Sequence, residues 1–405
     1  MTNSNIIQLH SERIYFDHCA TTKIYDEAQY ILLKYSGNNF GNPSSLYKTA
    51  RSLRKDLDNA RETLALAFGC LDIDIVFTSG GTEADNLAIY GCSGMLFNAF
   101  PKESQRKLSP VLVSAIEHEA VLNPAKALLA GEIRVGCDGL LDLDHLKSLL
   151  DDYQASQEEL KLVSVMLVNN ETGVIQPLEE VASMVKRYYP NALIHSDCVQ
   201  AFGAIDIREV TKDIDLMSFS AHKFGGPMGT GALVMRSRAR KNFTSLIRGG
   251  QQERGYRAGT ENLPAIMAMA EAAKICVARR EKETAKLKRL AEKLNGGIKK
   301  ISAEISLVTN ESKKIDYIML FHIPGVYGEE ICYLLDKENI EVSTGSACAA
   351  GAREPSHVLL AMGWARREAR QVIRVSLGRT NTEEEIDRFL FSFQKVLESF
   401  PQFSS

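Results

Sequence analysis

A lysine placed between small hydroxyl residues and glycines is the strongest chemical feature of this sequence. Lys223 lies within residues 218–229, preceded by Ser220 and His222 and followed by the glycine pair 225–226. Burial or a cationic neighbour lowers the pKa of such an amine, and its commonest use is a Schiff base with pyridoxal phosphate. Ser220 and His222 would then hold phosphate oxygens, and the glycines would let the backbone approach closely. The alternative is a surface lysine beside a glycine turn.

A glycine turn at the start of a predicted helix is a second candidate site. The turn Ser79-Gly80-Gly81-Thr82 follows an apolar run and opens the helix. It exposes backbone N–H groups at the positive end of the helix, which favours an anion such as phosphate, and Thr82 adds a hydroxyl. The alternative is an ordinary helix start that Ser79 or Thr82 caps.

Three further polar residues end or follow apolar runs. Asp197 ends the run 192–197, and a carboxylate buried there needs a partner such as a protonated pyridine nitrogen. Gln200 would then donate to the ring hydroxyl. His118 follows the run 111–116 and would stack on the flat cofactor and carry protons at the substrate. The alternatives are a structural salt bridge or helix cap for Asp197 and a structural role for His118.

Cys348 differs in its surroundings from the other seven cysteines. Residues 342–357 surround it with glycine, alanine, serine and threonine, which predicts a mobile loop and an accessible thiol. Such a thiol is a candidate nucleophile whose reactivity depends on its thiolate fraction. The alternative is a small-residue turn with an incidental cysteine.

Arg374 lies inside the apolar run 372–377, where a solvated charge is awkward. An arginine that faces a cleft binds a carboxylate through two parallel hydrogen bonds. A structural ion pair with an aspartate or glutamate is the alternative.

Length and charge exclude several classes of protein. The chain has 405 residues and a net charge of −3, so it offers no general attraction to nucleic acid or to an anionic membrane. No apolar run approaches the length of a transmembrane helix, and residues 1–10 lack a signal-peptide pattern. The eight cysteines contain no C-x-x-C pair, which favours reduced thiols and argues against a metal site. We therefore expect a cytoplasmic protein that binds no membrane, nucleic acid or metal.

Apolar runs alternate with helix-like segments through the first two thirds of the chain. The runs are short, at 73–79, 111–116, 162–169, 192–197, 216–220 and 231–235. This pattern predicts βαβ units and a buried, mostly parallel mixed sheet flanked by helices. Ligands bind at the carboxyl ends of the strands in such sheets. One crevice is therefore expected to collect the polar residues that follow the runs: Thr82, His118, Asn170, Asp197 and Lys223.

A different pattern follows this region. Residues 264–301 read as one long charged helix, and later residues predict strands at 317–322 and 372–377 and helices at 329–338 and 382–400. We expect a large α/β domain over 15–262. A smaller α+β domain would comprise 1–14 and 263–405, including the connecting helix and the Cys348 loop.

Taken together, these segments resemble the cysteine desulfurases of the NifS and IscS type, fold-type I pyridoxal-phosphate enzymes of the class V aminotransferase group. The resemblance covers essentially the whole chain in order. It is carried by Tyr15-Phe-Asp17-His18-Cys-Ala-Thr21-Thr22, Gly41-Asn42-Pro43-Ser44-Ser45, Thr78-Ser-Gly-Gly-Thr-Glu83, Glu117-His118, Asn169-Asn170-Glu171-Thr-Gly173, Ser196-Asp197-Cys-Val-Gln200, Ser220-Ala-His222-Lys223, Gln252-Glu253-Arg-Gly255-Tyr-Arg257-Ala-Gly259-Thr260, Ser343-Thr-Gly-Ser-Ala-Cys348 and Arg374-Val-Ser-Leu-Gly378.

The resemblance implies a role for each matching residue around the cofactor. Lys223 would form the Schiff base with pyridoxal phosphate, His118 would stack over the ring, and Asp197 would pair with the ring nitrogen. The residues expected on the ring hydroxyl side are Asn170 and Gln200, and those expected at the phosphate are Gly81, Thr82, Ser220 and His222.

The resemblance also implies a partner subunit and a substrate site. Thr260 is similar to the threonine that such dimers lend to the neighbouring subunit's phosphate, which implies a homodimer with shared sites. Arg374 would hold the substrate carboxylate, with Asn170 beside the substrate. Cys348 is similar to the persulfide-forming cysteine of the branch with the longer loop.

The reaction implied is removal of sulfur from L-cysteine. The released Lys223 amine would take the Cα proton, His118 would carry the proton at the substrate thiol, and Cys348 would attack the sulfur. The products are L-alanine and a persulfide passed to an acceptor protein, for iron–sulfur cluster assembly, tRNA thiolation or related sulfur trafficking. Rival interpretations are a selenocysteine lyase or cysteine sulfinate desulfinase, and a catalytically silent docking protein on the same fold.

The chain departs from the pattern of this family at a few positions. Tyr47 stands where histidine is common, Cys19 replaces alanine or asparagine, and Gln251 interrupts a common triple glycine. None of these residues is assigned a role in the reaction, so the departures bear on the subfamily and not on the chemistry.

Overall fold

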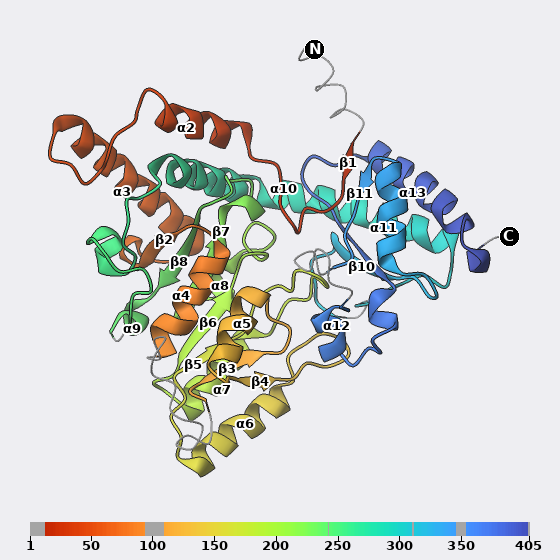
Figure 1. The fold of residues 1–405 in the computed structure, drawn as a ribbon, viewed down its shortest axis with the longest axis horizontal. Helices are drawn as coiled ribbons and strands as arrows, with labels where there is room; N and C mark the ends of the chain where they lie inside the picture. Colours follow the sequence, from red (N-terminus) through yellow and green to blue (C-terminus); the bar gives the residue numbers. More distant parts are fainter. Residues whose placement is uncertain (1–12, 94–108, 242, 310–311, 346–353, 404–405) are drawn as a thin grey trace.

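A seven-stranded sheet forms the centre of the larger part of the molecule (Figure 1). The computed structural model describes residues 13–93, 109–241, 243–309, 312–345 and 354–403. The strand order is β2-β8-β7-β6-β5-β3-β4; β8 is antiparallel to β2 and β7, and the other pairs are parallel. The strands are β2 (Ile75–Thr78), β3 (Val111–Ser114), β4 (Gly131–Ile133), β5 (Leu162–Ser164), β6 (Leu193–Asp197), β7 (Leu216–Ser220) and β8 (Gly231–Met235). The predicted mixed, mostly parallel sheet is confirmed.

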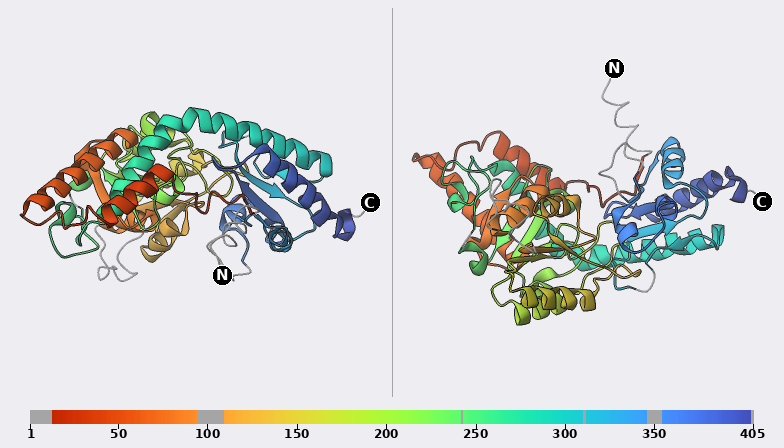
Figure 2. Two further views of the ribbon diagram at one scale, coloured as in Figure 1. Left: turned by 90° about the horizontal axis from the view of Figure 1, so that it is seen from above. Right: turned by 60° about the horizontal axis from the view of Figure 1, so that its bottom comes forward.

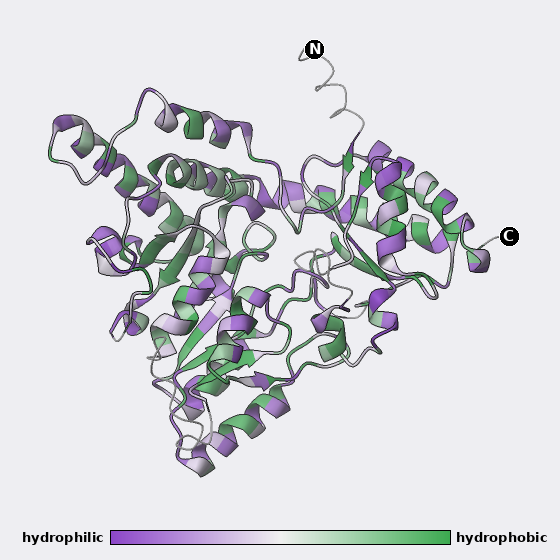
Figure 3. Ribbon diagram, in the orientation of Figure 1, coloured by the Kyte–Doolittle hydropathy of each residue, from purple (hydrophilic) through white to green (hydrophobic). Residues whose placement is uncertain are grey.

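The strands are buried on both faces, which explains their uninterrupted apolar character. In β2, Ile75 and Phe77 enter one core, and Val76 enters the core on the opposite face. The same alternation places Leu216 and Met217 of β7 on opposite faces. Figure 3 shows the strands as the most hydrophobic part of this region.

Helices cover both faces of the sheet. The face of Ile75 and Phe77 packs on α2 (Asp26–Ser36), α3 (Lys48–Phe68), α6 (Leu143–Ser156), α7 (Leu178–Tyr188) and the first half of α10 (Leu263–Ile301). The opposite face packs on α4 (Gly81–Ser93), α5 (Glu119–Ala127) and α9 (Ser237–Arg240). The short helix α8 (Ile207–Val210) places Ile207 in the first of these cores.

A second core surrounds a smaller sheet toward the C-terminus. Its strands, in the order β12-β10-β9, are β12 (Val372–Ser376), β10 (Ile318–His322) and β9 (Ser306–Leu307), all antiparallel. This core also takes side chains from α11 (Gly328–Lys337), α13 (Glu383–Glu398), the second half of α10, and the parallel pair β1 (Ile14–Tyr15) and β11 (Ile340–Glu341). The short helix α12 (His357–Ala361) lies between this region and the central sheet (Figure 1).

The long helix α10 joins the two regions. Its 39 residues correspond to about 58 Å at about 1.5 Å per residue, and Figure 2 shows it running across the top of both. Asn262 caps its first turn by accepting a hydrogen bond from the Ala265 N–H (3.4 Å). Because α10 contributes to both cores, the boundary between residues 262 and 263 stays a prediction.

The predicted element positions agree closely with the structure, with two instructive differences. The run 73–79 begins with a 3-10 turn at Asp72–Asp74, because the Asp74 carboxylate accepts the Leu71 N–H (3.1 Å) and keeps the chain turned. The run 162–169 forms a strand only to Ser164, although Val165 and Leu167 still donate to carbonyls of β6. Within the described ranges, no helix is both long and apolar enough to cross a bilayer.

Candidate active site

The carboxyl ends of β3, β5, β6 and β7 meet at one cavity of about 410 Å³. Every predicted site residue that the structure describes lines the cavity, with the exception of Thr260. The residues brought together are Gly81, Thr82, His118, Asn170, Asp197, Gln200, Ser220, His222, Lys223 and Arg374. The prediction that one crevice collects the residues following the strands is therefore confirmed.

Lys223 is the last residue of the 3-10 turn Ala221–Lys223, directly after β7. Its Nζ donates hydrogen bonds to the carbonyl oxygens of Cys19 and Ala20, the latter over 3.0 Å. Burial lowers the pKa of Lys223 from its ordinary 10.5. The amine is therefore more readily neutral, and more nucleophilic, than an exposed lysine, which contradicts the alternative of a surface lysine.

The backbone that receives Lys223 crosses between the two regions of the fold. His18 N–H donates to the Ser376 carbonyl (3.1 Å) in the smaller region, and Thr22 N–H donates to the His222 carbonyl (3.1 Å) in the larger one. The Cys19 N–H also donates to Ser376 Oγ (2.9 Å). These bonds fix the carbonyl groups that position the lysine amine.

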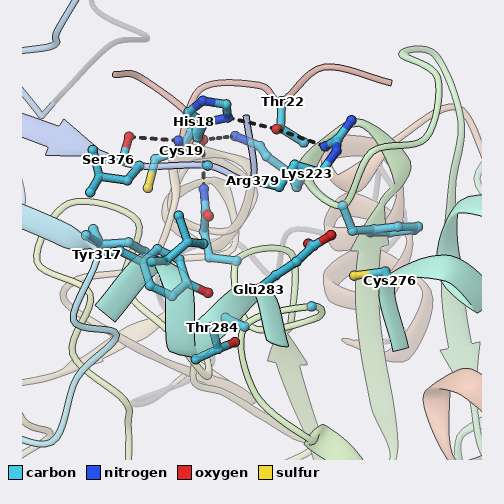
Figure 4. A pocket seen from close by; sticks show the side chains of 18 of the residues that line it. His18, Cys19, Thr22, Lys223, Cys276, Glu283, Thr284, Tyr317, Ser376 and Arg379 are labelled. Carbon is cyan, nitrogen blue, oxygen red and sulfur yellow. Dashed lines mark hydrogen bonds between the residues drawn. The ribbon is translucent and has the colours of Figure 1, made fainter. Parts of the chain in front are cut away.

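A smaller cavity of about 100 Å³ adjoins the active-site cavity (Figure 4). Cys19, Gln200 and Lys223 line both cavities. The smaller cavity is also lined by Tyr317 and Glu283. Lys223 therefore lies between the active-site cavity and this smaller cavity.

The first turn of α4, where an anion site is predicted, borders the cavity. Its backbone N–H groups have no acceptors within the helix, and exposed Thr82 lines the cavity there. A Cβ on Gly81 would lie 3.0 Å from Val199 Cγ2, so a larger residue would crowd this wall. Opposite, His222 Nδ1 bonds to Thr21 Oγ1 (3.1 Å), and burial lowers the pKa of His222 to about 4. His222 is therefore neutral at pH 7 and offers Nε2 as a ligand atom.

Asp197 lies in a buried acidic group with Asp85 and Glu117. Its Oδ1 accepts the Val199 N–H (2.8 Å), and burial raises its pKa. Burial also raises the pKa of Asp85 well above its ordinary value and that of Glu117 to about 8. Asp197 forms no salt bridge with another described residue, so the structural ion-pair alternative is not supported. A cationic ring nitrogen beside Asp197 would stabilise this site electrostatically.

His118 is both a helix cap and a cavity residue. It is the N-cap of α5, where its Nδ1 accepts the Ala120 N–H (3.1 Å). Because Nδ1 acts as an acceptor, the proton of the neutral ring is on Nε2. The structural role considered for His118 is thus real, and it fixes the tautomer of a ring that lines the cavity.

Arg374 is almost completely buried. It forms the structural ion pair considered above, and it also lines the cavity where a carboxylate could bind. Its Nη2 pairs with Asp17 Oδ1 (2.7 Å), and its Nη1 donates to the carbonyls of Asn170 and Gly345 (both 2.9 Å). The Nε atom is buried without a hydrogen-bond partner among the described residues. The structural ion pair therefore exists, and the Nε–H and one Nη2 N–H are left without a described protein acceptor to bind a ligand such as a carboxylate.

Thr260 is the one described residue of the predicted site that does not line this cavity. Thr260 is exposed at the surface of its own chain, and Cys348 lies outside the described residues, as does the expected mobile loop around it. The glycine pair 225–226 does not line the cavity either. Gly225 has a φ of +82° and its α-carbon faces the Tyr25 ring, so it serves a tight turn and not close approach to a ligand.

Several residues of the site were not assigned from the sequence. Asp85 and His357 line the cavity, and Glu171 accepts a hydrogen bond from Ser356 Oγ (2.5 Å) beside Gly345. Asp17 and Glu171 belong to the motifs that carry the family resemblance, and this membership was the only indication in the sequence that they belong to the site. Nothing in the sequence indicated that Asp85, one helical turn after the glycine turn, is buried near Asp197.

The residues present fit pyridoxal phosphate. The cavity offers an amine of lowered pKa at Lys223, hydroxyl and N–H donors for a phosphate at the start of α4, and a buried carboxylate at Asp197. The orphaned Arg374 Nε adds a place for a substrate carboxylate. A mostly parallel sheet with these groups at its carboxyl edge defines a fold-type I pyridoxal-phosphate enzyme.

Comparison with known proteins identifies the family. Residues 14–389 match the family Aminotransferase class-V. The chain is 36% identical over 394 residues to the cysteine desulfurase IscS of Clostridium botulinum, covering 96% of this chain and 95% of the relative. The chain belongs to the class V aminotransferase family and groups there with the IscS- and NifS-type cysteine desulfurases.

Solved structures agree with this assignment. A NifS-like protein superposes with a TM-score of 0.84 at 32% identity, covering 96% of this chain and 100% of that one. SspA in complex with cysteine superposes with a TM-score of 0.74 at 27% identity, covering 91% and 100%. Family and fold together establish pyridoxal phosphate as the cofactor.

Proposed function

We propose that this protein is a cysteine desulfurase that moves the sulfur of free L-cysteine to Cys348 and releases L-alanine. The observation that carries the proposal is the convergence of Lys223, Asp197, His118 and Arg374 on one cavity in a chain of this family. The relatives named cysteine desulfurase match nearly the full length of the chain.

Pyridoxal phosphate would be held by groups on three sides of the cavity. Asp197 would face its ring nitrogen, Gln200 and Asn170 its ring hydroxyl, and the phosphate would take hydrogen bonds from Gly81, Thr82, Ser220 and His222. When bound, the cofactor supplies an electron-accepting ring that stabilises negative charge at the substrate Cα. Burial raises the pKa of Asp197, so a positively charged neighbour would stabilise its ionised form.

The substrate is oriented by Arg374 and by the backbone around it. The partnerless Nε–H of Arg374 would donate to the substrate carboxylate, while Asp17 and the Asn170 carbonyl hold the guanidinium plane fixed. A fixed guanidinium selects an amino acid with a free carboxylate. The bound carboxylate would also satisfy a donor that is otherwise buried without a partner.

Lys223 and His118 would carry the protons. The Lys223 amine, with its lowered pKa, would take a proton from the substrate Cα. His118 presents an N–H at Nε2, because its Nδ1 is engaged by Ala120. From this position Nε2–H can donate a hydrogen bond to the substrate sulfur, and net transfer of a proton there requires Nδ1 to take one up and release the Ala120 N–H.

Cys348 would complete the transfer. Its thiolate attacks the substrate sulfur, so an S–S bond forms on the enzyme while the Cβ–S bond of the substrate breaks. The bonding electrons return to the carbon skeleton, which takes up a proton and leaves as alanine. The persulfide then passes to an acceptor protein such as an iron–sulfur scaffold or a sulfurtransferase.

We also propose a homodimer in which Thr260 completes the phosphate site of the neighbouring subunit. Its exposed position, away from its own cavity, supports this arrangement. The division into domains 15–262 and 1–14 with 263–405 belongs to the same proposal. A cytoplasmic location suits the scattered, unpaired cysteines.

The test is replacement of the proposed persulfide residue. Cys348→Ala should retain the yellow colour of the lysine-bound cofactor but lose alanine and sulfide production from cysteine by at least about 10³-fold, within the usual range for loss of a nucleophile. Cys137→Ala, which removes an exposed cysteine, should retain both. Continued cysteine desulfuration by Cys348→Ala would show that the persulfide mechanism is wrong and favour a selenocysteine lyase or sulfinate desulfinase. A colourless wild-type protein would favour a silent docking protein.

A further inference from the structure

The segment that carries Thr260 is anchored to its own chain by a buried ion pair. It begins with the 3-10 turn Gln252–Gly255, and Glu253 is 4% exposed. The Glu253 carboxylate binds Arg61 of α3 through two hydrogen bonds of 2.7 and 2.9 Å and accepts the Phe77 N–H of β2 (3.0 Å). A buried carboxylate that accepts three hydrogen bonds, two of them charge-assisted, fixes its own main chain firmly.

The backbone at this anchor is strained. Glu253 and its neighbour Arg254 have φ values of +46° and +58°, in the left-handed region that disfavours side chains. Each such residue costs about 1 kcal/mol or more. The Arg254 guanidinium donates to the carbonyls of Ile73 and Ile75, so both strained residues are held by contacts with the edge of the sheet. The contacts of the Glu253 and Arg254 side chains hold the backbone in this strained turn.

A second ion pair lies three residues before Thr260. Arg257 Nε and Nη2 donate to the two carboxylate oxygens of Glu83, over 2.9 and 3.3 Å. Glu83 lies in the first turn of α4 and also accepts the Ser79 N–H (2.8 Å). The pair therefore ties the Thr260 segment to the glycine turn that forms the anion site of its own chain.

The anchoring does not bring Thr260 into a cavity of its own chain. It is exposed, and it lines neither described cavity next to Lys223. The Gly259 N–H just before it donates to Gln252 Oε1 (3.2 Å), which closes the segment into a compact loop. The fold thus uses a buried ion pair to hold a loop whose tip is exposed and lines neither cavity.

We propose that Glu253 and Arg257 are positioning residues that present Thr260 to the cofactor phosphate of a second copy of this chain. The inference rests on the proposed homodimer with shared sites. A preorganised loop loses little conformational entropy when its tip meets the phosphate, so the anchors raise the affinity of the partner site. The Arg257–Glu83 pair also fixes the position of the loop tip relative to the glycine turn of the same chain. The residues that one chain contributes to the two phosphate sites are therefore held in a constant arrangement.

Hybrid dimers test the proposal, because the effect must appear in the other subunit. Two differently tagged chains are co-expressed, and one carries Lys223→Ala, so only the other chain's site gives the absorbance of the lysine-bound cofactor. In the first hybrid, Arg257→Ala lies in the Lys223→Ala chain, and the surviving site depends on that chain for its threonine. In the second hybrid, Arg257→Ala lies in the chain with intact Lys223. Equilibrium dissociation constants for pyridoxal phosphate are measured in both.

The expected result is weaker binding in the first hybrid, by about tenfold, as for loss of one hydrogen bond to a charged group. Thr260→Ala in the same arrangement provides the reference, and Arg279→Ala, which removes an exposed ion pair with Glu27, provides the control. Arg257→Lys, which keeps the charge but not the paired geometry, should fall between wild type and Arg257→Ala. Thermal unfolding confirms that each variant is folded.

The outcomes separate the two ideas. If Thr260→Ala leaves the first hybrid unchanged, the shared site is wrong and the inference falls with it. If Thr260→Ala weakens binding there and Arg257→Ala does not, the shared site stands and the positioning role is wrong. A loss confined to the second hybrid would also overturn the inference, because Arg257 would then support only its own glycine turn.

Discussion

Arg374, which lines the active-site cavity, forms an ion pair of 2.7 Å with Asp17 across 357 residues of sequence. Arg374 is 2% exposed, so its charge depends on this carboxylate. The pair also joins β12 of the smaller region to the backbone that receives the Lys223 amine. Substrate binding and the fold are therefore linked through one guanidinium.

Replacing Asp17 with asparagine should destabilise the protein. Removal of one partner leaves a buried charge without compensation, and we expect the free energy of unfolding to fall by about 3 kcal/mol. Chemical denaturation of the apo-protein measures this loss. Arg279→Ala, which breaks the exposed pair with Glu27, should change it by less than about 1 kcal/mol. Equal losses in the two variants would show that burial of Arg374 does not matter.

The buried carboxyl of Glu117 should make stability depend on pH. Burial raises its pKa from 4.5 to about 8, so the folded chain holds a proton that the unfolded chain has lost between these pH values. Wild-type stability should therefore fall from pH 4.5 to pH 8 relative to Glu117→Gln, and the difference should level off above pH 8. Each unit of pKa shift corresponds to about 1.4 kcal/mol.

Urea denaturation of the two apo-proteins at pH 5, 6.5 and 8 measures this slope. Glu119→Gln, two residues further on and exposed, provides the control and should show no such trend. A constant difference between wild type and Glu117→Gln across this range would mean that Glu117 is ionised in the fold.

Replacement of Gly225 should lower the stability of the fold, for a reason unrelated to ligand binding. Its φ is +82°, and a Cβ there would lie 2.6 Å from the Tyr25 ring. Gly229 has a similar φ of +77° but nothing within 4 Å. Gly229→Ala should cost about 1 kcal/mol from backbone strain alone, and Gly225→Ala should cost clearly more. Thermal unfolding of both variants isolates the steric part, and equal losses would show that Tyr25 moves aside freely.

The sequence predicted the strands well because they are buried on both faces and read as continuous apolar runs. It predicted Thr82, His118, Asp197 and Lys223 at one cavity because parallel strands end at the same edge of a sheet. It did not predict the partner of Arg374, since Asp17 is brought there only by tertiary folding. Burial of Asp85 beside Asp197 was missed for the same reason, because a helix start signals a cap and not the direction of a buried carboxylate.

The lowered pKa of Lys223 gives a prediction for the apo-protein that is independent of catalysis. Burial disfavours the charged amine, so the folded chain binds fewer protons than the unfolded chain between the lowered pKa and 10.5. Wild-type stability should therefore rise with pH in this window, whereas Lys223→Met has no such contribution. The stability advantage of Lys223→Met should shrink steadily as the pH approaches 10.5. Parallel denaturation at pH 7, 8.5 and 10 measures this difference, and a difference that stays constant would show that Lys223 keeps its ordinary pKa and needs the cofactor, not burial, to become a base.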